Sequence, residues 1–234
     1  MNTGSVVSGG VSVIAIDGPV ASGKTVVGRE LALMLGFEFL DTGIMYRAIT
    51  WLALRHGIQI GDEPALVELA NRHPVRLAGA GSDRVLVGEH AVGPELREAS
   101  VDSHVSLVAR VPEVRRALVR QQRALASRGR VVMVGRDIGT VVLPGADLKV
   151  FLSASPAQRS RRRWQELISQ DHKVELQEVL RETKARDEID SQRADSPLMP
   201  AEDAFLLDTE GLSVTQVVQR LMDRVHQLNL DCHR

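Results

Sequence analysis

The sequence has one cysteine, almost no net charge and no long apolar run, and each absence excludes a class of protein. Because Cys232 is alone and close to the end of the sequence, no internal disulfide can form, and a thiol there is a poor nucleophile. The 29 basic and 30 acidic side chains argue against a general binder of nucleic-acid polymers. No run approaches the roughly 18 apolar residues of a membrane span. We therefore expect a cytoplasmic protein that binds no membrane.

Length and composition favour one globular domain. At 234 residues, with 44% apolar and 25% charged residues, the chain can bury a sizeable core but is too short for two average domains. The opening MNTGSVVSGG lacks the basic and apolar regions of a signal peptide, and we expect residues 1–10 to be a disordered lead-in. Residues 11–234 are then predicted to form a single domain.

Apolar periodicity predicts strands alternating with helices, which is typical of a parallel sheet covered on both faces. We expect strands at residues 11–16, 37–40, 131–135, 148–152 and 204–208. We expect helices at residues 24–35, 43–56, 112–126 and 213–228. Ser213 and Gln216 form a capping-box signature that opens the last helix.

Two segments depart from this alternation. Between about residues 60 and 105 the pattern predicts an inserted lobe built of short strands, at 75–79 and 84–88. The arginine-rich segment 153–196 is strongly helical in composition, and we expect a lid at about residues 153–190.

The stretch IDGPVASGKT lies between the first expected strand and helix and matches the phosphate-binding pattern G-x-x-x-x-G-K-[ST]. Small residues there let backbone N–H groups surround phosphate oxygens at a helix N-terminus. Lys24 would add a positive charge near the β- and γ-phosphates, and the Thr25 hydroxyl would bind Mg²⁺. The ATP-binding residues predicted in this loop are Gly18, Pro19, Val20, Ala21, Ser22, Gly23, Lys24 and Thr25.

The loop alone predicts a bound nucleoside triphosphate and does not separate a kinase from a switch or a motor. A GTPase switch needs a base-reading N-K-x-D motif, which the sequence lacks, and a ring motor usually needs a larger chain. Two alternatives to the leading kinase hypothesis stay open: a small kinase acting on UMP, AMP or a shikimate-like acceptor, and a regulatory protein that binds ATP without transferring phosphate.

A second set of charges follows the expected strands and enters the lid. These motifs are DTGIMYR (41–47), GRDIGTVV (135–142) and ARDEIDSQRADSPL (185–198). Ligands of open α/β sheets bind at the carboxyl ends of the strands, and arginine grips phosphate oxygens in two places. The motifs therefore predict a binding site for a second phosphate compound.

With ASPAQRSRRRW, these motifs make the chain resemble bacterial cytidylate kinases, a family of P-loop nucleoside monophosphate kinases, over about residues 12–228. The resemblance implies an α/β, adenylate-kinase-like P-loop fold with a five-stranded parallel sheet, helices on both faces, a monophosphate-binding insert and a short lid. It implies transfer of a phosphoryl group from ATP to CMP or dCMP with Mg²⁺, in a monomer.

The resemblance also implies roles for individual residues. The monophosphate would be held by Arg47 and Arg136, with Thr42 and Tyr46 lining the same pocket. Ser106, Arg115 and Asp137 would read cytosine, which suits that base because a carboxylate accepts from its exocyclic amine. Arg186 and Asp190 would meet the ribose, and Arg193 would complete the pocket. Lid residues Arg159, Arg162 and Arg163 would approach ATP, and the catalytic charges would be Lys24, Arg136, Arg159 and Arg163.

Some residues also have simpler interpretations, and two depart from the family's pattern. Asp41 and Asp190 could be helix caps, Tyr46 could be core packing, and RSRRRW could be a solvated helix face. Many relatives carry an acidic residue where this chain has Val134, so Asp17 or Asp137 would hold waters bound to Mg²⁺, or the metal would rest on Thr25 and the phosphates. Ile189 replaces a commonly polar residue beside the ribose pair.

Overall fold

The computed structural model describes residues 10–77 and 85–231. The predictions for residues 1–9 and Cys232, and parts of the two strands expected at 75–79 and 84–88, lie outside the described residues.

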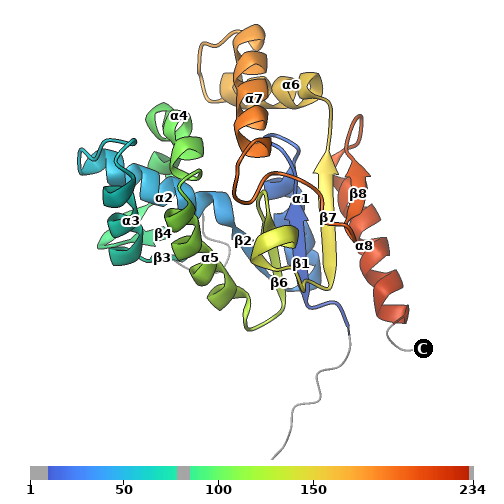
Figure 1. The fold of residues 1–234 in the computed structure, drawn as a ribbon. Helices are drawn as coiled ribbons and strands as arrows, with labels where there is room; N and C mark the ends of the chain where they lie inside the picture. The colour runs from blue at the N-terminus through green and yellow to red at the C-terminus, as the bar shows by residue number, and fades with distance from the viewer. Residues whose placement is uncertain (1–9, 78–84, 232–234) are drawn as a thin grey trace, which may run out of the picture.

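A five-stranded parallel sheet forms the centre of the molecule, as predicted (Figure 1). Its strand order is β2-β6-β1-β7-β8, and all four neighbouring pairs are parallel. The strands are β1 (Val13–Asp17), β2 (Glu38–Asp41), β6 (Val131–Val134), β7 (Leu148–Ser153) and β8 (Phe205–Asp208). Because β1 and β6 are buried on both faces, they are continuous apolar runs rather than alternating ones.

Helices cover both faces of this sheet. Side chains alternate along a strand, so Ile14 and Ile16 of β1 pack on one face and Ala15 on the other. The first face is covered by α1 (Lys24–Leu35) and α8 (Val214–Asp231), whose apolar residues share that cluster. The second is covered by α2 (Thr42–Arg55) and α5 (Pro112–Ala126). The capping box predicted for α8 is confirmed by bonds from Ser213 N to Gln216 Oε1 (2.9 Å) and from Gln216 N to Ser213 Oγ (3.2 Å).

The segment expected to hold only short strands also contains helices, so that prediction was incomplete. It has an antiparallel sheet of β3 (Val75–Leu77), β4 (Val85–Val87) and β5 (His90–Val92), and three helical elements: α3 (Glu63–Arg72), the 3₁₀ turn η1 (Pro94–Arg97) and α4 (Ala99–Val108). Asp62 caps α3 by accepting from Ala65 N at 3.1 Å. Helices α2 and α3 pack in one apolar cluster with the small sheet, so the insert shares the core on that face.

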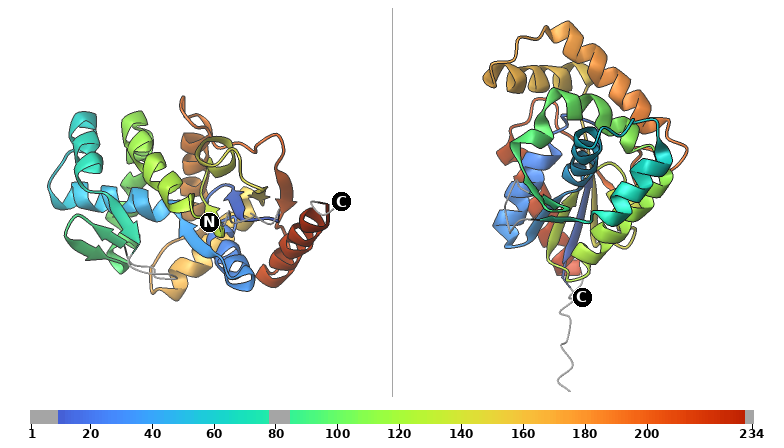
Figure 2. Two further views of the ribbon diagram at one scale, coloured as in Figure 1. Left: turned by 90° about the horizontal axis from the view of Figure 1, so that it is seen from below. Right: turned by 90° about the vertical axis from the view of Figure 1, so that its left-hand side faces the viewer.

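The arginine-rich segment, expected to be helical, forms two helices. They are α6 (Pro156–Ser169) and α7 (Leu176–Ser191), and they are separated by a bend where Asp171 has a left-handed φ of 61°. Both lie beyond the carboxyl ends of the central strands, and α7 contacts α4 of the insert (Figure 1; Figure 2, right). The strand ends are thus enclosed by the phosphate-binding loop below, α4 at one side and the two lid helices above.

Candidate functional site

The loop between β1 and α1 has the backbone geometry of an anion cradle. Gly23, at the start of α1, has a left-handed φ of 94°, and among the residues that the structure describes no side chain caps this helix. A Cβ on Gly18 would lie 2.2 Å from the carbonyl oxygen of Leu152, so only glycine lets the loop pass β7 this closely. The N–H groups at the helix start therefore have no side-chain acceptor, which is the arrangement that binds phosphate.

Lys24 folds back over this loop. Its Nζ donates to the carbonyl of Pro19 at 2.6 Å and lies 3.3 Å from Ser22 Oγ. Burial, with a smaller contribution from the nearby Arg136 guanidinium, holds the pKa of Lys24 well below its usual value, and Asp41, Asp17 and Asp190 oppose that shift. A phosphate chain in the loop would supply the negative charge that the buried ammonium lacks.

The Thr25 hydroxyl points at a carboxylate that the sequence had indicated only as a cap. Thr25 Oγ1 donates to Asp41 Oδ2 at 2.9 Å, while Asp41 Oδ1 accepts from Gly43 N at 2.9 Å and caps α2. The capping interpretation of Asp41 is therefore confirmed. An oxygen pair of hydroxyl and carboxylate, completed by phosphates and water, suits Mg²⁺. In the described part of the chain, no group of three or more His, Cys, Asp or Glu residues could hold a metal without such a ligand.

Asp17 shapes the loop after β6. Its two carboxylate oxygens accept from Ile138 N (2.8 Å) and Gly139 N (2.7 Å), which fixes the π-helical turn η2 (Ile138–Val142) against β1. Burial raises the pKa of Asp17 to about 6, although both N–H groups favour the charged form. Both oxygens already have protein donors.

A buried ion pair lies beside this turn. Arg115 of α5 donates to Asp137, and both side chains are almost completely buried. The guanidinium carbon of Arg115 lies 5.6 Å from the centre of the Tyr46 ring, so Tyr46 packs against this pair as well as in the core. Burial raises the pKa of Tyr46 to about 12. The neighbouring Gln122, which was not predicted from the sequence, is buried beside the Tyr46 hydroxyl.

Among the other predicted acceptor residues, two arginines share one carboxylate, that of Asp190. Arg136 Nε donates to Asp190 Oδ2 at 2.8 Å, and Arg193 donates to Asp190 Oδ1. Burial would raise the pKa of Asp190, but the two arginines outweigh it and lower the pKa. Thr42 Oγ1 donates to the Val134 carbonyl at 2.9 Å. Ser106 is half-buried on α4, and within the described ranges no hydrogen bond joins it to Arg115 or Asp137.

Three more arginines converge on Asp102 of α4, a residue for which the sequence analysis had no role. Asp102 Oδ1 accepts from Arg47 Nη2 at 2.5 Å and from Arg186 Nη2 at 3.2 Å, and Oδ2 accepts from Arg163 Nη2 at 2.9 Å. Burial opposes ionisation, but the arginines lower the pKa of Asp102 to about 2. We call these four residues the Asp102 cluster. Arg186 and Asp190, both expected to meet the ribose, have different hydrogen-bond partners here, and their ribose-binding role stays a prediction.

Of the two remaining lid arginines predicted to approach ATP, Arg159 contacts the phosphate-binding loop and Arg162 contacts Thr209 after β8. Arg159 donates to both oxygens of Asp187, at 3.0 and 2.6 Å, and to the Val20 carbonyl at 3.1 Å. Arg162 binds Thr209 Oγ1 (3.0 Å) and the Thr209 carbonyl (2.7 Å). The face of α6 that carries these arginines is therefore engaged with protein rather than solvated, and that interpretation of RSRRRW is wrong for these side chains.

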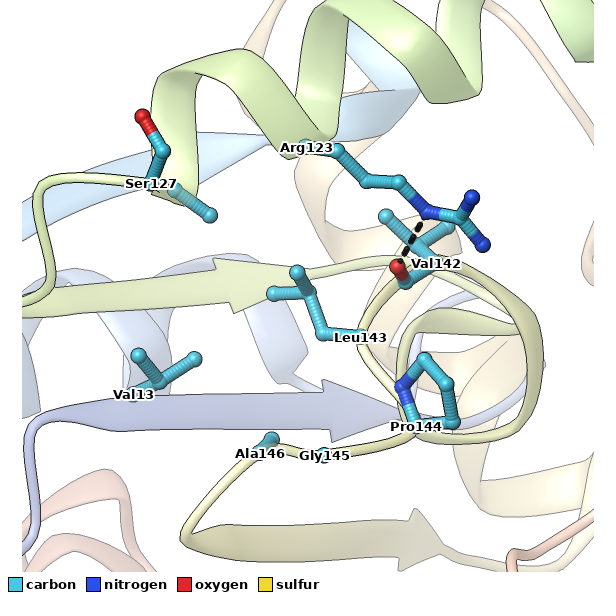
Figure 3. Close-up of a pocket in the computed structure, with 9 residues that line it drawn as sticks. Val13, Arg123, Ser127, Val142, Leu143, Pro144, Gly145 and Ala146 are labelled. Carbon is cyan, nitrogen blue, oxygen red and sulfur yellow. Dashed lines mark hydrogen bonds between the residues drawn. The ribbon is translucent and has the colours of Figure 1, made fainter.

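A cavity of about 300 Å³ lies at the opposite end of the sheet, beside the start of β1 (Figure 3). Arg123 closes one side of it through bonds to the carbonyls of Val142 (2.9 Å) and Val141 (2.7 Å). Its lining contains no residue that the sequence predicts to bind ATP or the acceptor, so it is separate from the charged site at the strand ends.

Comparison with known proteins agrees with this geometry. A family model described as cytidylate kinase matches residues 14–227. The chain belongs to the cytidylate kinase family. It is 48% identical over 214 residues to a cytidylate kinase of Pelotomaculum thermopropionicum, covering 91% of this chain and 95% of that one. It is 46% identical to a cytidylate kinase of Caldanaerobacter subterraneus, covering 92% and 94%.

Solved structures support the fold. A gluconokinase from Sinorhizobium meliloti matches with a TM-score of 0.50 at 14% identity, covering 95% of each chain, which bears on architecture alone. The cytidylate kinase match runs from β1 into α8 and so includes both the phosphate-binding loop and every charged cluster described above. No helix in residues 10–77 or 85–231 is both long and apolar enough to cross a membrane.

Proposed function

We propose that the protein transfers the γ-phosphoryl group of ATP to CMP and dCMP, giving CDP and dCDP, with Mg²⁺. The observation that carries this proposal is the pairing of a backbone phosphate cradle with arginine clusters across the same strand ends, in a chain of the cytidylate kinase family. Such a site holds two phosphate compounds with their phosphates facing each other.

ATP is assigned to the loop of residues 18–25 and to the lid arginines Arg159, Arg162 and Arg163. Two of these already contact the loop's surroundings: Arg159 binds the Val20 carbonyl, and Arg162 binds Thr209, whose hydroxyl lies 3.5 Å from the Ser22 carbonyl. Mg²⁺ is assigned to Thr25, with Asp41 as the adjacent carboxylate and Asp17 acting through a metal-bound water. The metal would supply charge neutralisation between the phosphates.

CMP is assigned to the arginine clusters and the buried pair. Arg47 and Arg136 hold its phosphate, and Arg115 with Asp137 reads the base, a role that the burial of this pair supports. The list of proposed acceptor residues is Thr42, Tyr46, Arg47, Ser106, Arg115, Arg136, Asp137, Arg186, Asp190 and Arg193. A base that leaves buried polar groups unpaired is rejected strongly, so Asp137 would favour cytosine over uracil.

The chain's own contribution to the transfer is position and charge. We assign Lys24, Arg136, Arg159 and Arg163 to stabilising the negative charge that spreads over the moving phosphoryl group. We assign no general base. Closure of α6 and α7 over the strand ends would exclude water that could otherwise receive the phosphoryl group.

The wider setting is also part of the proposal. We propose a monomeric, cytoplasmic enzyme that acts on free nucleotides and binds no nucleic-acid polymer or membrane. The net charge of -1 supports the last point as far as nucleic-acid polymers are concerned, because it gives no general positive surface. Residues 11–234 would act as one domain, with the monophosphate-binding insert at about 60–105 and the lid at about 153–190.

The test is ADP release with ATP and Mg²⁺ in the presence of CMP, dCMP, UMP, AMP or shikimate. CMP and dCMP should be turned over far faster than the others. A Lys24→Met preparation should release no ADP, while the exposed Lys173→Met should match the original protein. Equal turnover of UMP or AMP would contradict the base-reading roles, and ATP binding without turnover of any acceptor would indicate a regulatory protein.

A further inference from the structure

Asp102 is a carboxylate on which three arginines of the site converge. The three arginines that bind it come from three elements: Arg47 from α2, Arg163 from α6 and Arg186 from α7. Asp102 itself comes from α4, so one carboxylate joins the core, the insert and the lid. Under the proposed function, on which this inference rests, these arginines are the ones that meet the nucleotides.

The contacts use the donors that a phosphate would need. Each arginine directs a terminal nitrogen at the Asp102 carboxylate, and one further nitrogen of Arg47 and of Arg163 binds Leu96 O (3.0 Å) and Glu166 Oε2 (2.8 Å). Arginine binds carboxylate and phosphate oxygens with the same planar geometry. A carboxylate held by three guanidinium groups therefore has the surroundings of a bound phosphate group.

The charge balance decides whether both anions can remain. The three arginines, Asp102 and Glu166 together leave one net positive charge, and the exposed Arg97 lies 3.8 Å from Glu166 at the edge of this group. A phosphate dianion added beside an unmoved Asp102 would cancel or outweigh this positive charge, whereas a dianion that replaces the carboxylate would leave the group neutral or positive. A singly charged anion carries no more charge than the Asp102 carboxylate. Because Asp102 is attached to the chain, it competes at a high effective concentration, and such an anion would not displace it.

The surroundings of Asp102 would allow a phosphate to replace its carboxylate. Its side chain is 21% exposed, so it has an open side. Arg186 Nη2 also donates to the backbone carbonyl of Asp102 at 2.8 Å, so α7 keeps a bond to α4 when the carboxylate turns away. The low pKa of Asp102 means that protonation does not release it near neutral pH, and a competing anion must do so.

We propose that in the free protein the Asp102 carboxylate takes the place beside Arg47 where the acceptor's phosphate binds, and that a phosphate dianion must displace this carboxylate from Arg47. Asp102 thereby sets the affinity for the monophosphate and selects doubly charged acceptors. The opposite role is an anchor that stays in place and holds the arginines ready for phosphate. The two roles predict opposite effects of removing the charge.

The experiment is calorimetric binding of CMP, cytidine and inorganic phosphate, without ATP, at fixed ionic strength and pH 7.5. Asp102→Asn removes the charge and keeps the shape, so CMP should bind about tenfold more tightly, as loss of one charged competing hydrogen bond implies. Cytidine, which has no phosphate, should bind unchanged. Asp102→Glu, which keeps the charge, should bind CMP like the original protein. Asp223→Asn, an exposed acid on α8, is the control for net charge.

Weaker or unchanged CMP binding by Asp102→Asn would overturn the proposal, because the carboxylate would then support phosphate binding or be indifferent to it. If the original protein binds no CMP, the assignment of cytosine fails, and inorganic phosphate decides the present inference separately. Tighter phosphate binding by Asp102→Asn supports displacement, and equal phosphate binding in both proteins rejects it.

Discussion

The two halves of the proposed site would hold phosphate by different means. On the ATP side, the loop of residues 18–25 presents backbone N–H groups whose positions are fixed by Gly18, Gly23 and the start of α1. On the acceptor side, arginine side chains from α2, α7 and the β6–β7 loop would bind the phosphate compound, and carboxylates pair with them. A backbone cradle is ready for an anion, whereas a paired arginine must first change partner. The difference predicts that damage to one half leaves binding to the other half intact.

The largest expected effect is on the acceptor side. Arg136→Ala removes a guanidinium that the proposed mechanism places on the monophosphate, and it leaves Asp190 with Arg193 as its partner. We expect kcat/KM for CMP to fall about 10³-fold, as for loss of one charge-stabilising donor, with ATP affinity changed less than about threefold. Steady-state kinetics and separate ATP titration would measure both. Arg116→Ala, an exposed arginine on α5 that pairs with Glu113, is the control. Loss of ATP binding by a folded Arg136→Ala would contradict the division of the site.

The second-largest expected effect is on the ATP side, where ATP binding should weaken and CMP binding should remain. Gly18→Ala would push a Cβ into the Leu152 carbonyl at a φ of 149°, which forces the loop away from β7. Strain of this kind costs about 3 kcal/mol, so ATP should bind about 100-fold more weakly while CMP binding is retained. Calorimetry with each nucleotide alone would test this. Gly61→Ala, where a Cβ meets no atom within 4 Å, should bind both normally. An equal loss of CMP affinity would mean that the halves are not independent.

The same division explains what the sequence could predict. The loop, its flanking strand and helix, and the five-stranded sheet depend on local patterns, and all were predicted. Helix α3 was missed although its signals are present: Asp62 caps it, and Leu66, Leu69 and Ala70 form its buried face. Helix α4 gave little signal, because only Val101 and Val108 are buried on it.

The role of Asp102 could not be read from the sequence at all. Its partners lie 55, 61 and 84 residues away along the chain, and nothing beside it marks it as different from a solvated acid. The arginines were found because they belong to motifs, but motifs do not state which carboxylate neutralises each arginine in the free protein. Asp187 and Asp102 were both missed for this reason. Pairing is set by the tertiary fold, and the acceptor half depends on it more than the ATP half does.

The smallest expected effect is on the free energy of unfolding at acid pH, and it tests the pairing of Asp102 on the acceptor side. Asp102 has a pKa of about 2 in the folded protein and 3.8 ordinarily, so its ionised form stabilises the fold above pH 3.8, and that stability is lost as pH falls to about 2. Asp102→Asn should therefore lower the free energy of unfolding by about 2 kcal/mol at pH 7 and by almost nothing at pH 2. Urea unfolding of both proteins across this range would measure it, with Asp223→Asn expected to show no such trend. A constant difference at every pH would assign the loss to packing rather than charge. If the trend is observed, one carboxylate stabilises the free protein by the same contacts that phosphate must take over, so a variant that unfolds more easily when empty should hold the monophosphate more tightly.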